Sequence, residues 1–363
     1  IRRPPRSTLS PSSAASDVYK RQVIFYDGKN LKTYSSEIVS NKSVKPEKEF
    51  KIKLIDAKLF PSYDSRVLFG LNKKFDVVEL NPLTGKTKVR IENLRKTFDA
   101  HDMILDEYED LKTITSSRNG ACVAVISWSG IIVDKEGKIE PIERIEYKKK
   151  FTTERYVGTE FGPWGEERII TKEEEHISFE KAHVETGIIS PDCSHIALAG
   201  SLIFERCYAA VYSLDKKRYV LMRDVPYEEP FYEGAVWSFD SKLICFPYHD
   251  KEFRSGIEIF KLGHERSLHV SLEFPAVVYD SSPIEKKFAF YISDGTVLLL
   301  DVGGKEPKLE EIARIKENPL WLKWSPCGKY LLAVSEKKRI FIINTESREI
   351  MELKGRFATW FAI

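Results

Sequence analysis

The chain has 363 residues, with 57 lysine and arginine residues against 55 aspartate and glutamate residues, so its net charge is +2. Residues 1–22 hold five of the basic residues and one acidic residue, which leaves 52 basic and 54 acidic residues in the remainder. A nearly neutral chain with interspersed charges lacks the electrostatic footprint of a DNA- or RNA-binding protein. No run of about 18 apolar residues occurs, so no membrane-spanning segment is expected.

Residues 1–22, IRRPPRSTLSPSSAASDVYKRQ, are rich in Ser, Pro and Arg and have no apolar periodicity. Such a composition predicts disorder. The stretch resembles a translated sequencing adapter, and we exclude it from the prediction of the fold. The alternatives are a basic nucleic-acid-binding arm and a transit peptide. With this interpretation the true N-terminus is missing from the sequence.

Six stretches along the remaining chain share one pattern, in which a strand end is followed by a short polar turn and a second strand. Ser and Asp side chains bond the backbone of such turns, and Pro fixes φ at the second turn position. The last four stretches, anchored at Pro191, Phe239, Pro283 and Pro326, are 48, 44 and 43 residues apart. A repeat of 40–50 residues with four short strands is the signature of a β-propeller. The stretches are LFPSYDSRVLF (59–69), TSSRNGACVAVI (115–126), ISPDCSHIALA (189–199), WSFDSKLICF (237–246), SSPIEKKFAF (281–290) and WSPCGKYLLAV (324–334).

Each repeat continues with an alternating third strand, such as RIFIINT (339–345), and a more polar fourth strand, such as REIMEL (348–353). Charge on the outer strand blocks edge-to-edge pairing. Residues 23–45 read as a third and fourth strand and residues 355–363 as a first strand, so the two ends would share one incomplete blade. The sequence therefore predicts an all-β fold, a seven-bladed propeller of four-stranded antiparallel blades over residues 23–363. The complete blades are expected at 51–94, 110–147, 181–225, 232–274, 275–315 and 318–354.

The Ser-Pro turn of residues 325–333, echoed at 190–198, resembles the turns of WD-repeat and TolB-like propellers. The Trp-Asp pair that ends the third strand of typical WD repeats is absent, since Ile343-Asn344 and Leu300-Asp301 stand there. The resemblance implies a propeller that serves as a protein-interaction platform, although some such families are enzymes or accessory domains. It is a fold-level analogy.

The segment 148–180 interrupts the repeat and predicts an inserted hairpin, with strands FTTERYVG and ERIITKEE around FGPWG. Aromatic and arginine residues on such an insertion are typical of binding hot spots. We therefore expect a protein partner to contact Tyr156, Phe161, Trp164 and Arg168. The alternative is that the hairpin folds down and Trp164 covers a neighbouring blade.

The five cysteines, at 122, 193, 207, 245 and 327, are scattered and include no CxxC pair. This spacing argues against a disulfide framework or a zinc site and favours a reducing compartment, hence a cytoplasmic location. Cys327 lies in a turn that offers no positioned base, so a structural role is expected for it in place of a nucleophilic one.

The remaining candidate residues match no known catalytic or metal-binding motif. The acidic segment 97–110, with His101, matches no EF-hand and reads as a solvated loop or short helix. The neighbours His249 and Asp250 lie in a loop and do not form a dyad by sequence alone. His183 and His195 flank a first strand and could face the central channel. The seven histidines show no metal-ligand spacing, and the tryptophans near the ends of first strands, at 237, 321, 324 and 360, are expected to pack between blades.

The sequence thus favours an interaction scaffold without catalytic activity, cofactor or metal, monomeric outside a complex and bound to a protein partner. The alternative is a propeller hydrolase or a ligand-binding propeller, lactonase-like or TolB/peptidase-associated, with its site in the central channel. Whether the protein is an enzyme stays open at this point. Carboxylates and histidines converging on the channel would favour the enzyme, and a featureless channel would favour the scaffold.

Overall fold

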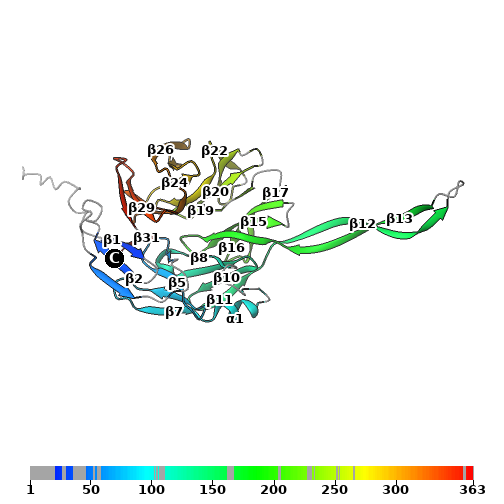
Figure 1. Cartoon of the computed structure of the whole chain (residues 1–363), viewed down its shortest axis with the longest axis horizontal. Coiled ribbons are helices and arrows are strands. Elements are labelled where there is room, and N and C mark those ends of the chain that lie inside the picture. Colours follow the sequence, from blue (N-terminus) through cyan, green and yellow to red (C-terminus); the bar gives the residue numbers. More distant parts are fainter. Residues whose placement is uncertain are drawn as a thin grey trace, which may run out of the picture.

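The structure, a computed structural model, describes residues 21–26, 30–35, 46–51, 54, 59–101, 103, 105, 111–161, 167–202, 206–226, 231–232, 234–250, 252, 254–264, 266–354 and 357–362. Within this part the chain forms antiparallel sheets arranged around a common centre, with one long hairpin that extends away from them (Figure 1). No helix of the described residues has the length and apolar character that a membrane crossing requires.

Consecutive strands pair within each sheet, and the first strand lies nearest the centre. The middle strands are buried apolar runs, whereas the fourth strand is more exposed and polar, as in β7 (Thr87–Ile91), where Thr87, Lys88 and Val89 are exposed. The sheets of this kind are β4–β7 (Phe60–Pro61, Leu68–Leu71, Val77–Leu80, Thr87–Ile91), β8–β11 (Leu111–Ser116, Cys122–Ser127, Gly130–Lys135, Lys138–Ile142), β14–β17 (His183–Ile189, His195–Leu202, Arg206–Ser213, Arg218–Pro226), β23–β26 (Ala276–Ser281, Lys287–Ile292, Thr296–Asp301, Lys308–Arg314) and β27–β30 (Pro319–Trp324, Tyr330–Ser335, Arg339–Asn344, Ile350–Lys354).

Both ends of the described chain contribute to one further four-stranded sheet. Its order is β3–β2–β1–β31, formed by Lys48–Lys51, Asn30–Ser35, Arg21–Tyr26 and Phe357–Ala362. Val23 pairs with Trp360, so the C-terminal strand takes the innermost place and residues 23–26 form the second strand, not the third. The expectation that this blade lacks a strand is wrong, because β3 completes it. The strand β1 begins at Arg21, two residues inside the segment expected to be disordered.

The sheet of residues 231–272 has five strands. Its inner edge is split into β18 (Phe231–Tyr232) and β19 (Val236–Trp237), which both pair with β20 (Leu243–His249) ahead of β21 (Ser255–Lys261) and β22 (Ser267–Leu272). The split falls around Gly234, whose position leaves no room for a side chain beside the Tyr279 hydroxyl. The prediction of seven four-stranded blades is therefore wrong: the described chain has six four-stranded blades, not seven.

The core lies between neighbouring sheets. Ile126 and Leu198, for example, belong to one cluster between β8–β11 and β14–β17, and Ile24, Leu59 and Leu68 join the sheet of the two chain ends to β4–β7. These side chains are almost completely buried. Burial of such apolar surface at each junction stabilises the arrangement of the sheets, at about 25 cal/mol per Å².

The turns between first and second strands lie on one face of the molecule, here called the turn face. Their geometry follows from the repeated Ser: the hydroxyl oxygens of Ser62, Ser190 and Ser325 each accept backbone N–H bonds from residues four or five positions later. A positive φ closes several of them, at Gly328 (71°) and Cys193 (62°) among others. The opposite face, here called the hairpin face, holds the starts of the first strands and the turns between second and third strands.

The hairpin consists of β12 (Glu146–Phe161) and β13 (Glu167–Lys181), which pair only with each other among the described strands. It connects the end of β11 to the start of β14 and so emerges from the hairpin face. Fifteen residues in a strand span about 50 Å, and Figure 1 shows the hairpin projecting away from the sheets. The alternative in which the hairpin folds down on a neighbouring blade is not what the described strands show; Trp164 itself lies outside the described residues.

The acidic segment 97–110 is described in part. A helix, α1 (Leu94–Asp99), precedes and overlaps it and buries Leu94 and Phe98, and Asn93 caps it by accepting the Lys96 backbone N–H. A short helix was one of the two expectations for this segment, and the structure places it at the start.

Candidate functional site in the central channel

The inner strands enclose a cavity of about 310 Å³ along the axis of the molecule. Inner strands of most of the sheets contribute to its wall, so the cavity lies in the central channel. The wall combines apolar and aromatic side chains with three threonines and one ion pair. Its residues are Phe60 and Pro61 of β4, Thr113–Thr115 of β8, Thr186–Ile188 of β14, Ala235 beside β19, Val277–Asp280 of β23 and Leu320–Lys323 of β27.

A buried ion pair lies at the turn-face end of the channel. Lys323 Nζ is 3.1 Å from Asp280 Oδ1, and the backbone N–H of Trp324 donates to Asp280 Oδ2 at 2.7 Å. Each of the two paired side chains is 11% exposed. Burial raises the pKa of the Asp280 carboxyl above its usual value, although the Lys323 charge acts in the opposite direction. The pair therefore presents a polar but electrically balanced floor.

Tyr63 closes the channel at this floor. Its hydroxyl lies 2.9 Å from Ser281 Oγ and 3.4 Å from the Ser282 carbonyl oxygen. The strand β4, which precedes Tyr63, is separated from β23 by β27 and β31 on one side and by β8, β14 and β19 on the other. Tyr63 therefore spans the channel, and burial raises the pKa of its hydroxyl above the usual value. The Arg118 guanidinium and the Lys323 ammonium each lie 5.8 Å from the centre of its ring.

The opposite end of the channel, on the hairpin face, has an apolar rim. Val277 and Leu320 begin the inner strands β23 and β27 and are 45% and 53% exposed. Phe274, in the connection before β23, is 38% exposed. Because single exposed apolar residues are common but a grouped set marks a binding surface, this rim indicates the entrance of the channel.

The channel wall offers hydrogen bonding more than acid–base chemistry. Among the described wall residues Asp280 is the one carboxylate, and both of its oxygens are hydrogen-bonded. Lys323 has Asp280 as its hydrogen-bond partner in the described chain, so two of its three N–H groups are available to a ligand. The sequence prediction did not include Asp280, Lys323 or Tyr63. A signal existed, because Asp280 and Lys323 occupy the same position of consecutive repeats, three residues before Pro283 and Pro326.

The histidines considered from the sequence lie outside the channel wall. His183 begins β14 on the hairpin face, and its ring stacks on Trp128. His195 lies in the second strand β15, with Nδ1 2.6 Å from Ser194 Oγ. Asp250 accepts from its loop neighbour Arg254. None of these histidines therefore belongs to a site with Asp280.

Cys327 occupies the turn after β27, and its Sγ lies 3.2 Å from Ser325 Oγ. This is the turn position expected for it. The tryptophan prediction is confirmed for three of the four residues, since Trp237, Trp324 and Trp360 are at most 3% exposed. The indole N–H groups of Trp237 and Trp360 each donate to a carbonyl of the preceding inner strand, at 3.0 and 3.1 Å. Trp321, in contrast, lines the channel.

Three of the residues expected to bind a protein partner lie in the two strands of the hairpin, and the fourth, Trp164, lies outside the described residues. Tyr156 pairs with Thr171 and Phe161 with Glu167, and a β-bulge lies between them. The register therefore places Tyr156 and Phe161 on the same strand, on either side of this irregularity. Arg168 lies in β13, in register with Glu160.

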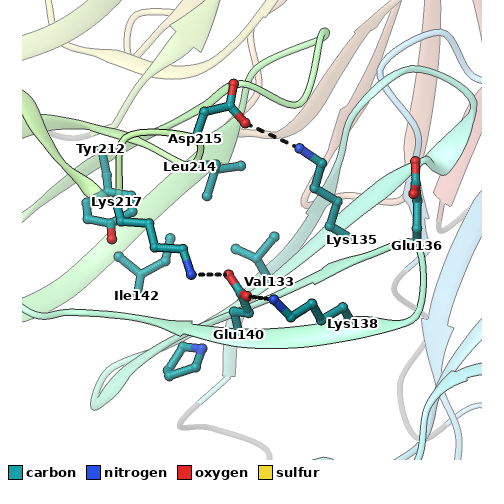
Figure 2. A pocket seen from close by; sticks show the side chains of 11 residues that line it. Val133, Lys135, Glu136, Lys138, Glu140, Ile142, Tyr212, Leu214, Asp215 and Lys217 are labelled. Atoms are coloured by element: carbon teal, nitrogen blue, oxygen red, sulfur yellow. Dashed lines mark hydrogen bonds and ion pairs between the residues drawn. The ribbon is translucent and has the colours of Figure 1, made fainter.

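A larger cavity, of about 740 Å³, lies on the outer rim between the sheets β8–β11 and β14–β17 (Figure 2). Five of its six charged side chains are paired with one another: Glu140 with Lys138 and Lys217, and Lys135 with Asp215. The two lysines hold the pKa of Glu140 below its usual value. Because these side chains are long, exposed and mutually neutralised, the groove is a weaker candidate than the channel.

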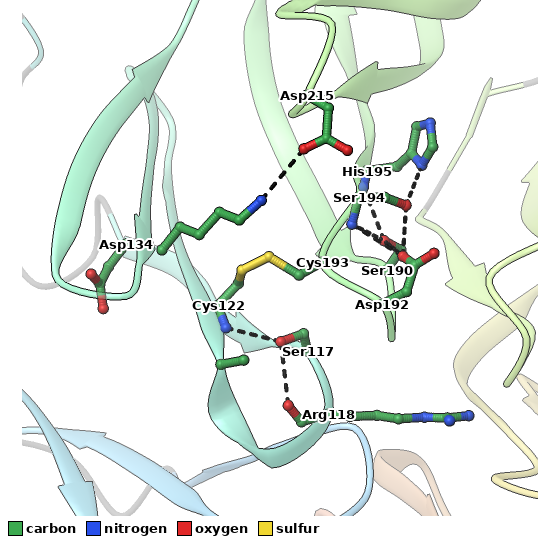
Figure 3. The surroundings of a disulfide bond; sticks show 12 residues. Ser117, Arg118, Cys122, Asp134, Ser190, Asp192, Cys193, Ser194, His195 and Asp215 are labelled. Carbon is green, nitrogen blue, oxygen red and sulfur yellow. Dashed lines mark hydrogen bonds and ion pairs between the residues drawn. A yellow bond between two sulfur atoms is a disulfide. The ribbon is translucent and has the colours of Figure 1, made fainter.

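A disulfide bond between Cys122 and Cys193 connects the same two sheets (Figure 3). Their Cα atoms are 5.9 Å apart, which is typical of a disulfide. The expectation of no disulfide is therefore wrong. The sequence separation of 71 residues arises because the hairpin is inserted between the two sheets. A cytoplasmic location stays a prediction, and the bond argues against it because disulfides persist in oxidising compartments.

Comparison with known proteins supports the fold. The chain matches no protein-family profile and no curated protein by sequence. Similar solved structures include dihydro-heme d1 dehydrogenase NirN in complex with DHE (TM-score 0.52, 13% identity, covering 94% of this chain and 74% of that one). A second is apo AztD from Citrobacter koseri (TM-score 0.55, 11% identity, covering 95% of this chain and 98% of that one). A third is a putative 6-phosphogluconolactonase from Bacteroides fragilis (TM-score 0.54, 13% identity, covering 98% of this chain and 100% of that one). At these identities the likeness shows a shared fold, the β-propeller, and WD-repeat or TolB-like membership stays a prediction.

Proposed function

We propose that the protein is a ligand-binding β-propeller that holds a small uncharged molecule in its central channel. The observation that carries this proposal is the channel itself: a cavity of about 310 Å³, closed at one end by Tyr63, with a buried ion pair at its floor. Ligand sites in proteins are concave, mostly apolar and have a few fixed polar groups, with volumes from about 300 Å³ upward.

The charges at the floor select the chemistry of the ligand. Asp280 balances Lys323, so a charged ligand would leave one buried charge without compensation, which is costly. The free N–H groups of Lys323 favour an acceptor such as a carbonyl or ring oxygen, and the threonine hydroxyls can both donate and accept. A compact ring with one carbonyl-bearing edge and one apolar face fits these groups.

The comparisons favour this alternative over a scaffold. One structural neighbour is described as a dihydro-heme d1 dehydrogenase in complex with DHE, and another as a putative 6-phosphogluconolactonase. We propose binding over hydrolysis because both oxygens of Asp280 are engaged, by Lys323 and by the Trp324 backbone. Docking of a protein partner on the hairpin remains a separate prediction.

The experiment is a thermal-shift screen of the full chain against uncharged cyclic amides and lactones, with the corresponding ring-opened acids and amines as comparison. Thr115→Phe fills the channel wall, and Thr87→Phe on the exposed outer strand β7 is the matched control. Compounds that raise the Tm of the unmodified protein and of Thr87→Phe, but not of Thr115→Phe, support the proposal. Compounds that raise the Tm of Thr115→Phe as much as that of the unmodified protein contradict the proposal. A larger Tm increase with the ring-opened acids than with the uncharged rings contradicts it as well.

A further inference from the structure

Arg144 lies at the root of the hairpin, and no counter-ion contacts it within the described part of the chain. It is half-buried and has no hydrogen bond or ion pair with any residue in the part of the chain that the structure describes. Burial lowers the pKa of its guanidinium below the usual value. Since a desolvated charge without a partner costs free energy, its presence at this place indicates a group that is bound there.

His183 faces Arg144 across the root of the hairpin. The register of Glu146 with Lys181, and the bond from the Ala182 N–H to the Ile145 carbonyl (2.9 Å), place residue 144 opposite residue 183. Residues directly opposite in an antiparallel pair lie on the same face. The buried Nδ1 of His183 has no hydrogen-bond partner within the described chain. Burial and the Arg144 charge lower the pKa of His183, while Glu185 acts in the opposite direction.

Trp128 adds an aromatic surface to these two groups. Its ring stacks on His183 with centroids 4.0 Å apart and an interplanar angle of 12°, and it still exposes 42% of its surface. The backbone around the stack is fixed, because the Val184 N–H donates to the Trp128 carbonyl and the Tyr208 hydroxyl to the His183 carbonyl (3.1 Å).

We propose that Arg144, His183 and Trp128 form a binding site for a small aromatic carboxylate on the hairpin face. The guanidinium supplies two parallel donors for the two carboxylate oxygens, as in the bidentate pairs that arginine prefers, and the stacked imidazole fixes the indole beside it. The indole supplies a stacking surface for the ring. Glu185, the nearest carboxylate to His183 on β14, is itself paired with Lys112 at 3.3 Å, so it leaves the positive charge of Arg144 available. The site is distinct from the channel and does not depend on the channel ligand.

The test is a titration of the full chain with benzoate in which the Kd is measured by isothermal titration calorimetry. Saturable binding is expected, and Arg144→Gln should raise the Kd about tenfold or more, since one charge-assisted hydrogen-bond pair is removed. Arg218→Gln, an exposed arginine on β17 of the neighbouring sheet, is the matched control and should bind as the unmodified protein does. Trp128→Leu should weaken benzoate binding to the level of acetate, which has no ring.

Stability gives a second readout. Because Arg144 has no partner among the described residues, Arg144→Gln should leave the Tm unchanged or raise it, whereas a purely structural arginine would lower it. Arg144→Lys keeps the positive charge and replaces Arg144→Gln in the test if that variant fails to fold. It should weaken benzoate binding, because the lysine ammonium lacks the planar guanidinium group that bonds both carboxylate oxygens. Absence of saturable benzoate binding, equal Kd values for Arg144→Gln and Arg218→Gln, or tighter binding of inorganic phosphate than of benzoate would overturn the proposal.

Discussion

The hydroxyl groups of Tyr63 and Ser281 lie 2.9 Å apart although the two residues are separated by 218 positions in the sequence. Tyr63 follows the inner strand β4, and Ser281 ends the inner strand β23 across the channel. This contact joins two turns across the end of the channel that lies opposite the apolar rim. The site and its access therefore depend on a bond between turns that no local sequence pattern specifies.

Removing this hydroxyl should destabilise the fold slightly. Tyr63→Phe loses the bonds to Ser281 and Ser282 but keeps the ring, so the free energy of unfolding in urea should fall by about 1 kcal/mol. Tyr330→Phe is the control, because its hydroxyl has no hydrogen-bond partner in the described chain. An equal loss for both variants would show that Tyr63 does not act through its hydroxyl.

The Asp280–Lys323 pair should be strongly coupled. Lys323→Met leaves the buried Asp280 carboxylate without its partner and should cost about 3 kcal/mol in urea unfolding. The double variant Asp280→Asn, Lys323→Met removes both charges and should recover most of that loss. The exposed pair on the hairpin face is the control: Lys112→Met should cost less than about 1 kcal/mol. Additive losses in the double variant would contradict the coupling.

The raised pKa of Asp280 predicts a pH dependence with a defined sign. The folded protein binds the Asp280 proton more readily than the unfolded chain, whose aspartates titrate near pH 3.9. The contribution of Asp280 to stability is therefore complete below about pH 4 and is lost as the pH rises through the folded pKa. The difference in unfolding free energy between the unmodified protein and Asp280→Asn should shrink as the pH is raised from 4 to 7. A difference that grows with pH would show that the Lys323 charge prevails over burial.

The all-β propeller architecture, though not the number of four-stranded blades, could be predicted from the sequence, because its signals are local. The Ser hydroxyl that accepts backbone N–H groups at Ser190 and Ser325 is encoded in each turn, and so is the alternation of the strands. The strand order of the terminal blade was predicted wrongly, because the sequences VIFY and KEFK do not indicate which position each strand takes in the sheet. That position is set by pairing with the C-terminal strand β31. The contact of Asp280 with Lys323 joins two sheets, and the contact of Cys122 with Cys193 spans an insertion. Such contacts follow from the ring geometry, which a single strand pattern does not contain.

The disulfide predicts a defined thiol count and a stability change. In protein denatured without reductant, three of the five cysteines should react with a thiol reagent, namely Cys207, Cys245 and Cys327. Cys122→Ser with Cys193→Ser should lower the free energy of unfolding by about 2–4 kcal/mol, because the loop of the unfolded chain is no longer constrained. Cys327→Ser, in a turn, should change it little. Five reactive thiols in freshly purified oxidised protein would contradict the bond.

The distal hairpin should be dispensable for folding. Replacing residues 155–172 by Asn-Gly joins Glu154 to Glu173, which are already paired in register, through a two-residue turn that suits such a connection. The described strands β12 and β13 bond only to each other, so the Tm should change by less than about 2 °C. The predicted contacts of Tyr156, Phe161 and Arg168 with a protein partner should be lost, while small-molecule binding in the channel persists. A large fall in Tm would show that the hairpin supports the ring, and the sequence-based expectation of a docking element would then lose its basis.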